Sequence, residues 1–195
     1  MVEPETVLRE GDALLIVDVQ NDFCPGGALP IEEGDAVVTV LNAWIAAARA
    51  AGVPVYASRD WHPPNHPSFA TEGGPWPVHC VQGTEGAAFH PDLALPADAV
   101  PVAKGTRFDK DQYSAFDETG LSAELARRGV RRVWIGGLAL DVCVKATALD
   151  AAAAGIEAHL IAGASRPVTA EGGAEALREM AAAGVILEEP PSARG

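Results

Sequence analysis

The sequence predicts an α/β protein: a three-layer sandwich in which helices cover both faces of a six-stranded parallel sheet. Short apolar runs, typical of strands buried on both faces, alternate along the chain with alanine-rich helical segments. This alternation indicates parallel strands joined by right-handed helical crossovers. No internal repeat or low-complexity linker divides the 195 residues, so we expect one domain over residues 1–195.

The elements follow in order along the chain. Predicted strands cover residues 13–19, 53–58, 99–104, 133–135, 156–164 and 185–189, and predicted helices cover residues 36–51, 120–128, 142–154 and 169–184. Asp35 is the expected N-cap of the first helix and Gly52 its end, and Thr119 or Ser122 is expected to cap the second. The tails, residues 1–10 and 190–195, are expected to fray.

A long irregular stretch, residues 61–98, is rich in proline, glycine and histidine. Connections of this length in a compact domain are usually either functional or disordered. The tryptophans and histidines within the stretch argue against disorder. We therefore expect it to carry part of a functional site.

Composition excludes several classes of function. The net charge is −13, from 14 basic and 27 acidic residues, and no basic stripe that would bind nucleic acid or an anionic membrane is visible. No apolar run reaches the ~20 residues of a spanning helix, and the opening residues are polar, so the cytoplasm is the expected compartment. Three widely spaced cysteines, Cys24, Cys80 and Cys143, do not form a disulfide framework.

Reactive side chains stand at the ends of four predicted strands. Asp18, Asp60 and Lys104 end or follow the first three, and Cys143 follows the strand at 133–135. Parallel strands bring their carboxyl ends to one edge, where α/β sheets bind ligands. An acid, a lysine and a thiol together form a nucleophilic set, because the acid can take the thiol proton and the lysine can hold the acid ionised.

The segment around Cys143 combines a strand, a glycine pair and a helix. Gly136 and Gly137 are expected to break the strand and form a turn. Cys143 then falls in the first turn of the following helix, where the helix dipole, together with the charge of Lys104, favours a thiolate. The alternative is a buried, inert cysteine, the commoner state of a free thiol.

A second group of ligand-type residues begins at the end of the 53–58 strand. Asp60, His62 and His79 offer one carboxylate and two imidazoles, a set that suits zinc, iron or manganese. His66 lies in the same loop. Cys80 is less suited because adjacent residues seldom reach one metal together. The two remaining histidines, His90 and His159, are expected to be structural.

Three aromatic residues, Phe23, Trp76 and Tyr113, fall in loops near the strand ends. Aromatic side chains around a nucleophile suit a flat ring substrate. Ordinary core packing is the alternative explanation for them.

With these residues in view, the sequence resembles the nicotinamidases, within the isochorismatase-like cysteine hydrolases. The motifs that carry the resemblance are VDVQNDFCPGG (17–27), SRDWHPPNHPSFA (58–70), WPVHCVQGTEGAAFHP (76–91), KGT (104–106), YSAF (113–116) and GLALDVCV (137–144).

The resemblance implies a role for each of these groups. It implies an Asp18–Lys104–Cys143 catalytic triad, and a divalent metal, foremost zinc, held by Asp60, His62 and His79. It also implies a cis peptide at Leu138–Ala139, an oxyanion hole made by the N–H groups of Ala139 and Cys143, and a substrate pocket lined by Phe23, Trp76, Tyr113 and Leu138.

Two positions depart from the family pattern. Leu140 and Val142 replace a threonine and an aromatic or histidine residue, and we expect Leu140 to alter the pocket wall or the hydrogen bonds of the turn. His66 is assigned to the second coordination shell or to a water-mediated contact.

The implied reaction is hydrolysis of nicotinamide to nicotinate and ammonia, a step of NAD salvage, with a small-molecule substrate and a self-association surface on the apolar helix 145–154. The alternatives are an isochorismatase-like amidase for a related carboxamide and a non-catalytic metal-binding protein of the same fold. Cys143 counts against an isochorismatase, and the Asp60-x-His62 loop counts against a carbamoyl-amide hydrolase. The absence of a CxxC pair counts against thiol redox chemistry.

Overall fold

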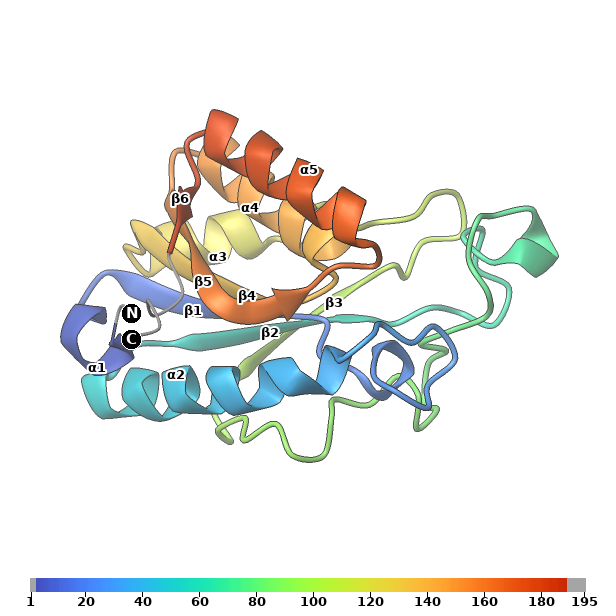
Figure 1. Ribbon diagram of the computed structural model, residues 1–195, viewed down its shortest axis with the longest axis horizontal. Helices are drawn as coiled ribbons and strands as arrows, with labels where there is room; N and C mark the ends of the chain where they lie inside the picture. Colours follow the sequence, from blue (N-terminus) through green and yellow to red (C-terminus); the bar gives the residue numbers. More distant parts are fainter. Residues whose placement is uncertain (1–2, 189–195) are drawn as a thin grey trace.

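The computed structural model describes residues 3–188 and contains a parallel sheet of six strands in the order β3-β2-β1-β4-β5-β6 (Figure 1). The strands are β1 (Asp12–Val17), β2 (Val55–Asp60), β3 (Val100–Lys104), β4 (Arg132–Leu138), β5 (Glu157–Arg166) and β6 (Ile186–Leu187). The helices are α1 (Pro4–Val7), α2 (Val37–Ala51), α3 (Leu121–Arg127), α4 (Lys145–Ala153) and α5 (Ala170–Ala182). The predicted fold class is confirmed.

Helices cover both faces of this sheet: α1 and α2 lie on one side and α3, α4 and α5 on the other (Figure 1). Alternate side chains of β1 enter the two cores, as the period of a strand requires. Leu14 and Ile16 pack with the residues of α2. Leu15 and Val17 pack with residues of α3, α4 and α5. The sheet centre is therefore rigid, and its carboxyl edge is a firm support for a site.

The ends of the helices agree with the sequence in part. Gly52 ends α2 in the left-handed conformation at φ 67°, and the Thr169 side chain caps α5 by accepting from the Gly172 N–H. The Thr119 hydroxyl accepts from the Leu121 N–H at the start of α3 at 3.2 Å. The prediction that Asp35 caps α2 is wrong, because a 3₁₀ turn over Gly34–Ala36 precedes that helix.

The N-terminal segment is more ordered than a frayed tail. Residues 4–7 form the helix α1, and Leu8 is buried in the core on the α2 side. The Arg132 side chain also donates to the Val7 carbonyl at 2.7 Å. Of the two predicted tails, residues 190–195 lie outside the described residues.

The predicted break at the two glycines is wrong, because β4 continues through Gly136 and Gly137 to Leu138. Gly137 adopts φ 133°, and a side chain there would collide with the Val17 backbone of the neighbouring strand. Close approach of β4 to β1, rather than a turn, is what requires glycine here. The turn begins at Leu138–Ala139, whose peptide bond is cis as the resemblance implied.

A π-helical turn over Leu140–Val144 follows and leads into α4. It differs from the single regular helix predicted for residues 142–154. Such π turns are frequent at functional sites.

The long connection between β2 and β3 is held in place by polar side chains. The Gln20 amide donates to the carbonyls of Asp60 and Ala87 and accepts from the Asp60 N–H, at 2.8 to 2.9 Å. The Asp22 carboxylate accepts from the Cys80 N–H at 2.7 Å. These contacts tie the loop to the segment that follows β1, at the carboxyl edge of the sheet (Figure 1). Within residues 3–188, no helix has the length and apolar character needed to cross a membrane.

Candidate active site

The four reactive residues predicted at the strand ends lie together. Lys104, at the end of β3, is fully buried, and its Nζ lies 2.6 Å from an oxygen of Asp18 and 2.6 Å from one of Asp60. The same ammonium is 3.5 Å from the Cys143 Sγ. Carboxylate oxygens of Asp18 and Asp60 lie within 4.8 Å of that sulfur. One ammonium therefore joins two acids and a thiol.

Asp18 follows β1 in a left-handed conformation at φ 48° and has no exposed surface. Its second carboxylate oxygen accepts from the Ser58 hydroxyl at 2.7 Å. Burial raises the pKa of Asp18, and the negative charge of Asp60 adds to this, although Lys104 opposes both. Asp18 is consequently a stronger base than an exposed carboxylate.

The pKa of the Cys143 thiol differs from what the sequence predicts. Burial raises its pKa well above the usual range, and the charge of Lys104 opposes this rise without reversing it. The expectation of a thiolate stabilised by the helix start and the lysine is therefore wrong for the resting state, because desolvation outweighs both effects. The resting thiol holds its proton and needs a neighbouring base.

The second group, Asp60, His62 and His79, also comes together. The second oxygen of Asp60 lies 3.5 Å from Nε2 of His62 and 3.8 Å from Nε2 of His79. In each histidine, Nδ1 lies 2.7 Å from a backbone carbonyl, of Gly105 and Pro77 respectively. A carbonyl can only accept, so Nδ1 carries the hydrogen and Nε2 keeps its lone pair.

Metal-ligating histidines have this arrangement, with the far nitrogen donating to a fixed acceptor. The donor atoms of Asp60, His62 and His79 lie within 4.8 Å of one another, so the residues present fit a divalent transition metal. Burial raises the pKa of Asp60, but the charge of Lys104 and the hydrogen bond that Lys104 donates outweigh it, so the pKa is lowered and the donor is ionised.

His66 lies beside this group. Its ring stacks on His62 with centroids 4.1 Å apart, and its Nδ1 is 2.7 Å from the Ser68 hydroxyl. Its Nε2 is buried and has no hydrogen-bond partner. Cys80 is not among the close groups of ligand-type residues in residues 3–188. His159 stacks on Trp134, away from the cavity, which confirms its structural role.

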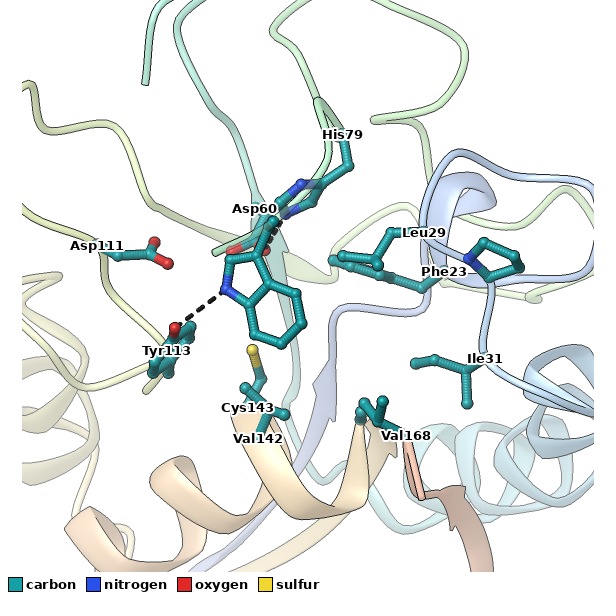
Figure 2. A pocket seen from close by; sticks show the side chains of 13 residues that line it. Phe23, Leu29, Ile31, Asp60, His79, Asp111, Tyr113, Val142, Cys143 and Val168 are labelled. Carbon is teal, nitrogen blue, oxygen red and sulfur yellow. Dashed lines mark hydrogen bonds and ion pairs between the residues drawn. The ribbon is translucent and has the colours of Figure 1, made fainter. Parts of the chain in front are cut away.

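A cavity opens directly above Cys143. Figure 2 shows Phe23, His79, Tyr113 and Cys143 around it, each from a different segment of the chain. The three predicted aromatic residues all line the cavity, and the indole Nε1 of Trp76 donates to the Tyr113 hydroxyl at 3.1 Å. Ala139 and Cys143, the residues of the implied oxyanion hole, also line it.

Two expectations for the turn need correction. Leu138 does not line the cavity, because its side chain is fully buried in the core on the α2 side. Leu140 does not line it either and packs instead in the core on the α5 side. The π turn directs Val142, the other departure from the family pattern, into the cavity wall.

The sequence did not indicate five residues that complete the lining: Leu29, Pro30, Ile31, Asp111 and Val168. Val168 follows β5, so the rule that ligands bind beyond strand ends would have found it. The Asp141 carboxylate holds it there, accepting from the N–H groups of Val168 at 2.8 Å and Thr169 at 3.3 Å. The segment 29–31 carries no signal of its own, and Asp111 lies in a loop whose course no local pattern predicts.

Comparison with known proteins agrees with this arrangement. Residues 12–189 match the isochorismatase domain, and the chain belongs to the isochorismatase family. It is 41% identical to the nicotinamidase of Escherichia coli over 90% of this chain and 93% of that protein.

Solved structures give the same result. The pyrazinamidase of Pyrococcus horikoshii in complex with zinc superposes with a TM-score of 0.89 at 46% identity, covering 92% of this chain and 99% of that one. The PnC1 protein of L. infantum in complex with nicotinate superposes with a TM-score of 0.86 at 37% identity, covering 94% and 96%.

Proposed function

We propose that this protein is a nicotinamidase, which hydrolyses nicotinamide to nicotinate and ammonia in NAD salvage. The observation that carries the proposal is the buried Asp18–Lys104–Cys143 cluster, which opens onto an aromatic cavity beside a metal-type donor set. The similarity to the Escherichia coli nicotinamidase, and to a relative solved with nicotinate, supports the choice of substrate.

In the first half of the reaction, Asp18 accepts the proton of the Cys143 thiol. The sulfur attacks the carboxamide carbon, and the carbonyl π electrons move to oxygen. Lys104 stays charged and holds Asp18 in position, because its Nζ lies 2.6 Å from that carboxylate. The raised pKa of Asp18 suits it to take a proton from a thiol whose own pKa is raised.

The negative oxygen that forms in this step needs hydrogen-bond donors. The backbone N–H groups of Ala139 and Cys143 belong to residues that line the cavity, and we assign them this role. Loss of one such donor typically costs a reaction ~3 kcal/mol of transition-state stabilisation.

Collapse of this intermediate breaks the C–N bond. Asp18 returns its proton to the departing nitrogen, which leaves as ammonia, and a thioester remains on Cys143. Asp18, again a carboxylate, then takes a proton from water, and the water oxygen attacks the thioester carbon. The C–S bond breaks, the thiol regains its proton, and nicotinate is released.

Asp60, His62 and His79 would hold the divalent metal. When bound, it supplies a Lewis acid that orients and polarises a ring bearing a nitrogen lone pair. Phe23 and Trp76 line the cavity walls, where they suit the faces of a flat ring, and Tyr113 keeps the indole in place through its hydroxyl.

Ammonia release from a panel of amides tests the proposal. We expect rapid release from nicotinamide and pyrazinamide, and little from benzamide, which lacks the ring nitrogen, or from an aliphatic amide. Cys143→Ala protein, purified in the same way, controls for contaminating amidases. Equal rates on all four amides would contradict a ring-selective enzyme, and no release from any of them would favour the non-catalytic alternative.

Elemental analysis of the purified protein tests the metal separately. We expect about one transition metal per chain, as a single site of three protein ligands implies. Metal-free protein that keeps full activity would contradict the metal assignment and leave the cysteine mechanism standing.

A further inference from the structure

Ser58, on β2, is a fully buried polar residue that contacts Asp18 twice. It lies opposite Val17 in the pairing of β1 with β2, and its carbonyl accepts from the Asp18 N–H at 3.1 Å. Its hydroxyl donates to Oδ1 of the Asp18 carboxylate at 2.7 Å. The backbone and the side chain of Asp18 are therefore both attached to one residue of the neighbouring strand.

The Ser58 hydroxyl is committed to this contact. Ser58 does not line the cavity, so a substrate held there would not touch it. Within residues 3–188, the hydroxyl has no hydrogen-bond partner other than Asp18. A buried hydroxyl costs free energy unless it is hydrogen-bonded, so Asp18 accounts for the presence of a serine at this position of the strand.

The Lys104 ammonium also contacts Asp18, but in a different way. Among the described residues, its aligned hydrogen bonds go to Asp60 at 2.6 Å, to the Gln112 carbonyl at 3.4 Å and to the Cys143 Sγ at 3.5 Å. Oδ2 of Asp18 lies 2.6 Å from the same nitrogen, yet it has no hydrogen-bond partner, because the contact is poorly aligned. Attraction between charges depends on distance rather than direction, so Lys104 attracts the Asp18 carboxylate without fixing its plane.

The two oxygens of Asp18 are consequently in different situations. Oδ1 already accepts the hydrogen of the Ser58 hydroxyl, whereas no hydrogen bond is made to Oδ2. Oδ2 and the Cys143 Sγ both contact Lys104 Nζ, at 2.6 Å and 3.5 Å, so Oδ2 is the oxygen on the side of the thiol. A lone pair of Oδ2 is therefore the one open to the thiol hydrogen.

We propose that Ser58 is a positioning residue of the hydrolysis: its hydroxyl holds Oδ1 of Asp18 and thereby presents Oδ2 to the Cys143 thiol. When the proton moves, the S–H bond breaks and an O–H bond forms at Oδ2, while the electron pair stays on the sulfur. The same oxygen later returns this proton to the departing ammonia. The inference rests on the proposed function, because it specifies how the base of that reaction is oriented.

Two variants of equal size isolate the hydroxyl. Ser58→Thr keeps it and Ser58→Val replaces it with a methyl group, so the pair differs in the hydrogen bond rather than in volume. We expect kcat for nicotinamide to fall about tenfold to a hundredfold in Ser58→Val and in Ser58→Ala, the usual effect of losing a hydrogen bond to a charged group. Ser58→Thr should keep kcat within about fivefold of wild type. KM should change by less than about twofold in all three, because Ser58 lies outside the cavity lining.

Ser165→Ala is the matched control, since the Ser165 hydroxyl on β5 is buried and has no hydrogen-bond partner among the described residues. It should leave kcat and KM unchanged, and urea midpoints show whether each variant is folded. If the threonine variant does not fold, the comparison of Ser58→Ala with Ser165→Ala decides.

A wild-type kcat in Ser58→Ala, an equal loss in folded Ser58→Thr and Ser58→Val, or an effect confined to KM would overturn the inference alone. Wild-type protein that releases no ammonia from nicotinamide would overturn the proposed function, and this inference with it.

Discussion

The two edges of the sheet each hold a buried cluster of charged groups, and the clusters are built differently. At the amino edge, Asp12 at the start of β1 accepts from Arg132 Nε at 2.8 Å and from a terminal nitrogen of Arg132 at 2.6 Å. Trp134 Nε1 donates to the same carboxylate at 3.2 Å. Both carboxylate oxygens of Asp12 therefore accept hydrogen bonds, and the second acid near Arg132, Glu157, lies 3.9 Å away with its side chain 53% exposed.

At the carboxyl edge, one buried base pairs with two buried acids. One ammonium, that of Lys104, is shared by Asp18 and Asp60 and approaches the Cys143 thiol. The pKa of Asp18 is raised while that of Asp60 is lowered. When the pKa values of neighbouring carboxylates diverge in this way, the two groups are suited to different roles: Asp18 to accepting a proton, and Asp60 to acting as an ionised ligand.

The difference between the edges teaches that a buried ion pair alone does not mark a site. The amino-edge pair fixes β1 against β4, whereas the carboxyl-edge cluster leaves groups able to exchange a proton or accept a ligand. Substitutions that separate stability from activity should distinguish the two edges.

Removing the nucleophile should have the largest effect. Cys143→Ala is expected to lower kcat by more than about a thousandfold, because the covalent step is lost. Binding of nicotinamide, followed by calorimetry, should be nearly unchanged. A variant that releases ammonia at a rate close to wild type would refute covalent catalysis.

Removing the Lys104 ammonium, which Asp18 and Asp60 share, should lower both stability and activity. Lys104→Met leaves two buried carboxylates without their cation and is expected to cost about 3–5 kcal/mol of unfolding free energy, together with most of the activity. The matched change at the other edge, Arg132→Met, should cost about 1–3 kcal/mol and leave kcat near wild type. Urea unfolding and ammonia release measure both variants. Loss of activity in folded Arg132→Met would contradict the division between the edges.

The pH dependence follows from Asp18. A protonated carboxyl cannot accept the thiol proton, so the rate should fall as pH decreases through the pKa of Asp18. Burial raises that pKa above its ordinary value of 3.8, so the acid limb should lie above that value. A profile of kcat/KM against pH checks this, and a limb at or below the ordinary value would contradict it.

The smallest effect is expected at the cavity rim. Asp141→Ala removes the two hydrogen bonds that hold Val168 and Thr169. We expect KM for nicotinamide to rise about threefold to tenfold with kcat nearly retained, since each bond contributes about 0.5–1.5 kcal/mol. Val168→Ala, which shortens the side chain without freeing the loop, is the companion variant. A fall in kcat alone would place Asp141 in the chemistry instead.

Sequence reasoning succeeded where a strand end fixes a residue. Asp18, Asp60 and Lys104 end or directly follow apolar runs, so their approach follows from the geometry of a parallel sheet. The same logic failed at Gly137, because its need for glycine comes from the Val17 backbone of another strand. It failed for Leu140 and Val142 because a π turn reverses which of them faces the cavity. The state of the Cys143 thiol depends on burial, which no local pattern reveals.

The pairing of β1 with β4 also affects how the chain folds as it is made. These strands are neighbours at the middle of the sheet, yet Asp12 and Arg132 are separated by 120 residues along the chain. One edge of β1, the strand that Asp18 follows, therefore has no partner until β4 has been synthesised. The nucleophile, Cys143, comes directly after β4 in the chain. On the ribosome, completion of the hydrophobic core and assembly of the reactive cluster therefore become one late event. A shortened chain that ends before β4 contains Asp18 and Lys104 but lacks the nucleophile Cys143, so it is inactive.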